Sequence, residues 1–130
     1  MRTIRAIAPI AAATALLVPA APGLAKKGGN DGRVTKSGDC SGASNWKLKA
    51  KPDDGRLEVE FEVDQNRNGV KWNVRLRRNG KSVASGARRT KAPSGSFSFN
   101  RRIANPAGKD RISAVARRAS GETCRASLRI

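Results

Sequence analysis

The chain has 130 residues, and its 27 Lys and Arg against 10 Asp and Glu give a formal net charge of +17 at pH 7. It contains no His, which excludes a Ser-His-Asp triad, a His general base and a His-ligated metal. A chain of this size suits one small domain, and the positive charge favours attraction to polyanions.

Residues 1–25 are predicted to be a cleaved signal peptide. A short basic start precedes an uncharged run, residues 6–25, and the small residues Gly23 and Ala25 suit a cut after position 25. An uncleaved membrane anchor is the alternative, but the run barely reaches membrane-spanning length and prolines interrupt it. We therefore expect a secreted protein that has no membrane span after cleavage.

Residues 26–39 are rich in Gly and charge and poor in apolar side chains. Such a composition predicts a flexible linker, so the folded domain is expected to cover residues 40–130. Cys40 and Cys124 are the only cysteines. Because an exported chain reaches an oxidising compartment, these two residues are predicted to form a disulfide.

From residue 45 onward the apolar side chains alternate with polar ones, which predicts β-strands and no helix. The expected strands cover residues 46–51, 57–63, 70–76, 81–87, 97–103, 112–116 and 124–130. Seven short strands at this spacing indicate an antiparallel β-sandwich or barrel.

Turn residues predict three hairpins. Pro-Asp-Asp-Gly at 52–55 is a tight turn that would set Lys51 opposite Arg56, and Asn79-Gly80 is a two-residue hairpin signal. A turn at 119–121 would place Cys124 opposite Ala116.

The succession LEVEFEV, VKWNVRL, a hairpin at NG, GSFSF, DRISAVA and TCRASLRI resembles an immunoglobulin-like or fibronectin type III-like domain. Trp72 lies where such domains often bury a Trp on their third strand. The resemblance implies an all-β, seven-stranded antiparallel immunoglobulin-like sandwich. The chain departs from the pattern because it has no Tyr and because its cysteines are not the usual facing pair. The whole chain also resembles small exported proteins of actinobacteria, which implies a location and no chemistry.

Four acids, Glu58, Glu60, Glu62 and Asp64, recur at every second position of one predicted strand. A catalytic carboxylate pair needs a cleft that drives the pKa values of its two members apart, so that one acts as an acid and the other as a base. This stripe instead lies on an open strand face beside lysines, so we expect a ladder of exposed ion pairs and no catalytic residues.

Residues 64–69 match D-x-N-x-N-G, the first half of a calcium loop, with Asp64, Asn66 and Asn68 as candidate ligands. The twelfth position is Arg75 where calcium loops have Glu, and the motif holds one carboxylate. A turn held by side chains that bond backbone amides is therefore favoured over a metal site. No metal and no other cofactor are expected.

The arginines include four adjacent pairs near strand ends, and these are the predicted polyanion contacts: Arg77, Arg78, Arg88, Arg89, Arg101, Arg102, Arg117 and Arg118. In the immunoglobulin-like order they would lie at both poles, so the charge is expected to be spread and to attract polyanions without sequence preference. The sequence thus predicts a secreted, non-catalytic binding domain for anionic cell-wall polymers or acidic surfaces. The alternatives are an extracellular enzyme, an enzyme inhibitor and a nucleic-acid-binding protein.

Overall fold

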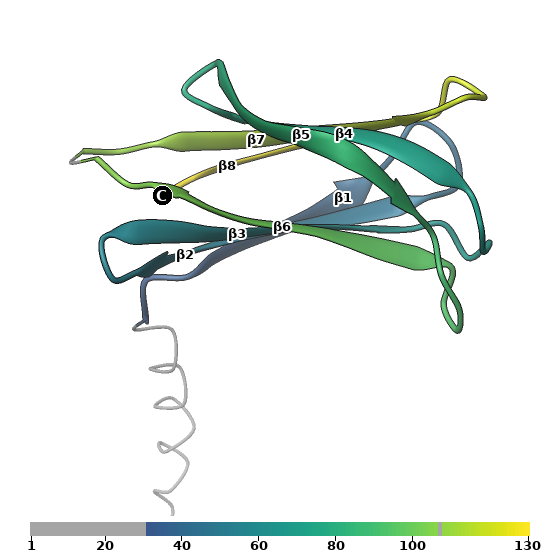
Figure 1. Cartoon of the computed structure of the whole chain (residues 1–130), viewed down its shortest axis with the longest axis horizontal. Helices are drawn as coiled ribbons and strands as arrows, with labels where there is room; N and C mark the ends of the chain where they lie inside the picture. Colours follow the sequence, from purple (N-terminus) through teal and green to yellow (C-terminus); the bar gives the residue numbers. More distant parts are fainter. Residues whose placement is uncertain (1–30, 107) are drawn as a thin grey trace, which may run out of the picture. The chain divides into compact units, whose positions relative to one another are not determined.

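The computed structural model describes residues 31–106 and 108–130. The predicted signal peptide and the first residues of the predicted linker lie outside the described residues. The described chain forms two antiparallel four-stranded sheets that are stacked as layers (Figure 1). The first sheet has the order β1 (Val34–Asp39), β2 (Asn45–Asp53), β3 (Arg56–Asp64), β6 (Ser96–Ala104). The second has the order β5 (Lys81–Arg89), β4 (Lys71–Arg78), β7 (Arg111–Arg118), β8 (Thr123–Arg129).

The fold is an all-β sandwich, one of the two architectures that the alternation of side chains predicts, and it is compatible with the immunoglobulin-like fold that the resemblance implies. The number of strands is corrected from seven to eight, because β1 lies inside the segment expected to be a linker. Strand β1 is an edge strand that pairs with β2, and only Val34 and Gly38 of it are half-buried. Its backbone hydrogen bonds hold it in the sheet, and a hydrophobic pattern cannot show such bonds. Gly38 lies opposite Trp46, and a Cβ there would come within 2.7 Å of the indole Cζ2 atom.

The first hairpin differs from the predicted register by two residues. Asp53, in place of Lys51, lies opposite Arg56. The turn contains only Asp54 and Gly55, both with positive φ (53° and 79°), so the two residues before them extend the strand. Because the shift is an even number, the same side chains face the core and only their partners change.

The other two hairpins confirm the prediction. Asn79 and Gly80 form a two-residue turn with φ of 52° and 85°, and Cys124 lies opposite Ala116. Strand β3 pairs with β6, the neighbour expected from the immunoglobulin-like order, and not with β4.

The core lies between the two sheets and is built from the inward side chains of both. Trp72, Phe61 and Phe99 are its largest fully buried members. The Trp72 indole donates a hydrogen bond of 3.0 Å to Gln65 Oε1, which satisfies its buried N–H group.

The predicted disulfide between Cys40 and Cys124 is present, and it joins the β1–β2 connection to β8. It therefore links the two sheets on one side of the sandwich. Such a bond is compatible with an extracellular location. No helix in the described ranges is long and apolar enough to cross a membrane.

Candidate anion-binding face

Charge is divided unequally between the two sheets. The strands of the first sheet carry seven basic and six acidic side chains. The strands of the second sheet carry twelve basic side chains and neither Asp nor Glu. Nearly all of the excess positive charge of the strands therefore lies on one layer, a division that the expectation of spread charge did not contain.

The outward side of the second sheet forms a surface that we call the cationic face. Its basic members are all exposed: Lys71, Arg75, Arg77, Arg89, Arg111, Arg117, Arg125 and Arg129. Between them lie small or neutral side chains, among them Ser85 and Val115. The four strands contribute no carboxylate to this surface, so its positive charge is not neutralised from within the sheet.

A shallow depression of about 660 Å³ lies in the middle of the cationic face. Arg75, Arg77, Arg117 and Arg125 line it from three neighbouring strands, and Gly86 belongs to its lining from β5. Arg75 and Arg125 occupy one row of the sheet, on either side of Val115. Because guanidinium groups present paired N–H donors, they suit phosphate and carboxylate groups.

The adjacent arginine pairs do not act as units, because neighbouring side chains in a strand point to opposite faces. The exposed members are Arg77, Arg89, Arg102 and Arg117, and the half-buried members are Arg78, Arg88, Arg101 and Arg118. Arg102 belongs to the first sheet. Of the predicted contacts, only Arg77, Arg89 and Arg117 lie on the cationic face.

Some of the half-buried arginines bind the protein itself. The Arg78 guanidinium donates a bond of 2.8 Å to the Ala104 carbonyl oxygen. Arg118 pairs with Glu122 at 2.9 Å and lies over the Trp72 ring. Arg75 lies on the cationic face but is not among the predicted contacts. The signal for it was available, because Arg75 alternates with the core residues of its strand.

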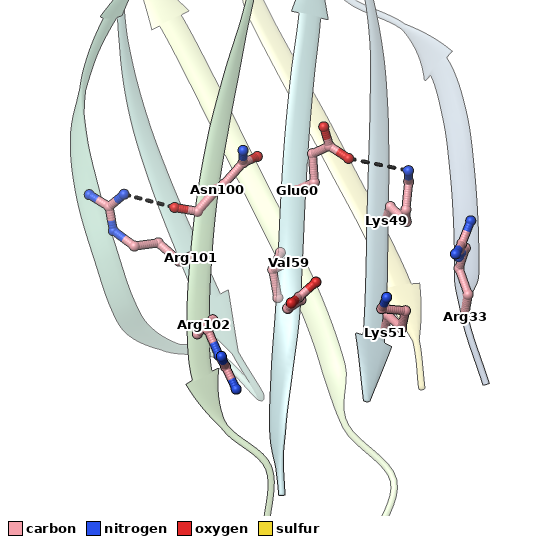
Figure 2. Close-up of a pocket in the computed structure, with 9 residues that line it drawn as sticks. Arg33, Lys49, Lys51, Val59, Glu60, Asn100, Arg101 and Arg102 are labelled. Carbon is pink, nitrogen blue, oxygen red and sulfur yellow. Dashed lines mark hydrogen bonds and ion pairs between the residues drawn. The ribbon is translucent and has the colours of Figure 1, made fainter. Parts of the chain in front are cut away.

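The acid stripe lies on the outward side of the first sheet, opposite the lysines of β2, namely Lys47, Lys49 and Lys51. Figure 2 shows Glu60 of the stripe beside Lys49. Lys49 pairs with Glu60 at 3.2 Å, and Arg102 pairs with Asp53 at 3.5 Å. The depression there, of about 440 Å³, is open and contains both signs of charge. Of the four acids of the stripe, only Glu60 forms an ion pair within the described chain, so the predicted ladder is present at one position. Each exposed pair contributes only about 0–1 kcal/mol.

The loop at residues 64–69 forms a turn held by its own polar groups. The Asn66 amide donates a bond of 3.2 Å to Asp64 Oδ1, as expected for an Asx turn. The Gln65 and Asn66 amides also donate to the Gly95 carbonyl oxygen, so the loop is packed against the connection before β6. No cluster of three His, Cys, Asp or Glu that would suit a metal occurs among the described residues.

Glu122, in the β7–β8 turn, is a buried acid at the same end of the sandwich as the loop at 64–69, and both contribute to the lining of one depression. Its side chain is 5% exposed, and it accepts bonds from the Ser44 amide at 3.0 Å and from Arg118 Nε at 2.9 Å. Burial by itself raises the pKa of Glu122, but the Ser44 amide and the Arg118 guanidinium outweigh it and hold the pKa below 4.5. The carboxylate thereby ties the β1–β2 connection to the second sheet.

Replacing Glu122 with Gln is expected to lower the free energy of unfolding at pH 7 by about 1–3 kcal/mol, since it removes a charge from a buried bonded group. The folded pKa is below the unfolded one, so this contribution is complete above about pH 4.5 and is lost as the pH falls below that value. Denaturant unfolding at pH 7 and pH 3 should show that the difference between the variant and the wild type shrinks in acid. Glu58→Gln, at an exposed position, is the control, and an equal difference at both pH values would contradict the assigned role of Glu122.

No protein-family model, curated protein or solved structure matches this chain. Function is therefore inferred from the chemistry of the molecule's own surface.

Proposed function

We propose that the protein is a secreted, non-catalytic binding domain that associates with anionic polymers or acidic surfaces outside the cell. The cationic face is the proposed contact surface. The observation that carries this proposal is that the four strands of the second sheet contain twelve basic side chains and no acidic one. Anionic cell-wall polymers are the partners that such a face would meet outside a cell.

The non-catalytic assignment is supported by the lack of His and by the position of the acids. Glu58, Glu60 and Glu62 lie on an open sheet face, whereas a catalytic pair is placed in a closed site. The immunoglobulin-like sandwich suits this role because its wide sheets present surface without needing an active-site cleft.

Nucleic acid fits the cationic face only as one polyanion among others. The aromatic side chains are inward, and Trp72, Phe61 and Phe99 are fully buried, so the face offers no ring on which a base would stack. The contacts it does offer are guanidinium and ammonium groups, which suit the charged backbone of any such polymer.

The test is binding of linear polyphosphate and of poly-glutamate at about 0.1 M salt, measured by titration calorimetry. The triple variant Arg75→Gln, Arg117→Gln, Arg125→Gln is expected to bind about 100- to 500-fold more weakly, because each lost contact no longer releases a counterion.

The matched control removes three positive charges from the first sheet: Lys49→Gln, Lys51→Gln and Arg102→Gln. It should change affinity by about twofold or less, since net charge far from the contact has a weak, screened effect. Equal losses in the two triple variants would mean that total charge, and not this face, attracts the polymer.

A further inference from the structure

The side of the sandwich away from the disulfide is formed by the edge strands β5 and β6, which lie beside each other. At this edge the inward alternation of apolar side chains is broken by Arg88 in β5 and Arg101 in β6. Arg88 lies opposite Trp72, and Arg101 lies between Phe99 and Ile103 on the inward side of its strand. Inward charges on edge strands discourage unwanted strand pairing, so position alone does not define a site.

The two guanidinium groups converge on one aromatic ring. The Cζ atom of Arg88 is 4.8 Å from the centroid of Phe99, and that of Arg101 is 4.2 Å from it. The two Cζ atoms therefore lie within about 9 Å of each other. Figure 2 shows the Arg101 guanidinium on the side of β6 away from Glu60 and Lys49. The ring fixes both groups by cation–π contact and leaves them at the rim of the core.

Neither guanidinium has an acidic partner within the described chain. Arg88 Nη1 donates to the Ala87 carbonyl oxygen at 2.8 Å, and Arg101 Nη1 donates to that of Asn100 at 2.9 Å. The described salt bridges involve other residues. A guanidinium has five N–H donors, so donors remain on both groups. Two half-buried like charges within about 9 Å of each other repel, and an anion that contacts both groups would relieve that repulsion.

Gly86 provides the space for this arrangement. A Cβ at position 86 would lie 3.0 Å from Phe99 Cε2 and 3.8 Å from Arg101 Nη2. The backbone of Gly86 is not among those with positive φ, so a larger residue would be allowed there by backbone conformation. The close approach of the Phe99 ring is what favours glycine there, whereas the distance to Arg101 Nη2 is an ordinary van der Waals contact.

We propose that Arg88 and Arg101 form a binding site for a phosphate or sulfate group at the β5–β6 edge. A separation of about 9 Å or less is within the span of a tetrahedral oxyanion that accepts a charge-assisted bond of about 2.8 Å from each side. The group is either a free ion or part of a polymer. The site is additional to the cationic face and does not depend on the function proposed for that face.

The test follows the Phe99 ring signals and the arginine Nε–H signals by NMR while sodium phosphate, sodium sulfate or short polyphosphate replaces chloride at constant ionic strength. The wild-type protein should show saturable shifts of Phe99, Arg88 and Arg101. In the double variant Arg88→Met, Arg101→Met, the anion should no longer shift the Phe99 signals. Met is chosen because it keeps an apolar cover over the ring. The control Arg75→Gln, Arg125→Gln should titrate like the wild type.

Saturation by inorganic phosphate or sulfate would support a free ion as the ligand, and saturation by polyphosphate alone would support a group of a polymer. Linear, non-saturating shifts in the wild type would overturn the proposal, and so would unchanged Phe99 shifts in the Met variant. If the Met variant does not fold, Arg88→Lys, Arg101→Lys keeps both charges and loses the paired donors. It should bind severalfold more weakly, and wild-type affinity in that variant would refute a guanidinium site.

Discussion

Replacing Cys40 and Cys124 with Ser is expected to lower the free energy of unfolding by about 2–5 kcal/mol. The disulfide closes a loop with a sequence separation of 84, for which the chain-entropy model gives about 4–5 kcal/mol. The bond also joins the β1–β2 connection to β8, so it fastens the edge strand β1, which buries little apolar surface of its own. A domain of this size has only about 5–15 kcal/mol of stability in total, so the loss would be large.

Denaturant unfolding of the oxidised wild type, the reduced wild type and the double Ser variant measures this effect. The reduced wild type isolates the loss of the bond, whereas the variant also places a hydroxyl at position 124, which is fully buried. The variant should therefore be at least as unstable as the reduced protein. If all three proteins unfold at the same denaturant concentration, the disulfide does not stabilise the fold.

Most of the fold follows from the period of two in the sequence, because alternation decides which side chains enter the core. The largest buried side chains, Trp72, Phe61 and Phe99, follow this alternation, and an error of two residues at Asp53 left the faces unchanged. Strand β1 could not be found in this way. Its place in the sheet depends on backbone pairing and on the fit of Gly38 against Trp46, and neither leaves a hydrophobic period.

The predicted contact residues are divided between the two sides of the sheets, for a related reason. Adjacent arginines such as Arg77-Arg78 look like a patch in sequence, but a strand sends them to opposite sides, so one is exposed and the other is half-buried. The absence of acids from four strands was visible in the sequence. It became meaningful only with the strand order, which shows that those four strands make one sheet.

Binding of linear polyphosphate is expected to weaken by about a thousandfold between 50 and 200 mM salt. Engagement of about six basic groups, fewer than the cationic face contains, gives a slope of log K against log salt of about −4 to −5, at −0.7 to −0.9 per contact. At physiological salt the affinity should then be micromolar or weaker, on the order of 10⁻⁴–10⁻⁶ M as for other non-specific contacts with a polyanion.

Variants of the two sheets show which surface makes the salt-dependent contacts. Removal of Arg75, Arg117 and Arg125 should bring the slope closer to zero by about 2–3, because those three contacts no longer release counterions. The control that removes Lys49, Lys51 and Arg102 should keep the wild-type slope, since these groups lie on the outward side of the other sheet. Titrations at four or five salt concentrations measure both slopes. If the cationic face is the contact surface, the slope becomes shallower in the variant without Arg75, Arg117 and Arg125 and stays unchanged in the control. A shallower slope in the control alone would instead place the contact surface on the first sheet.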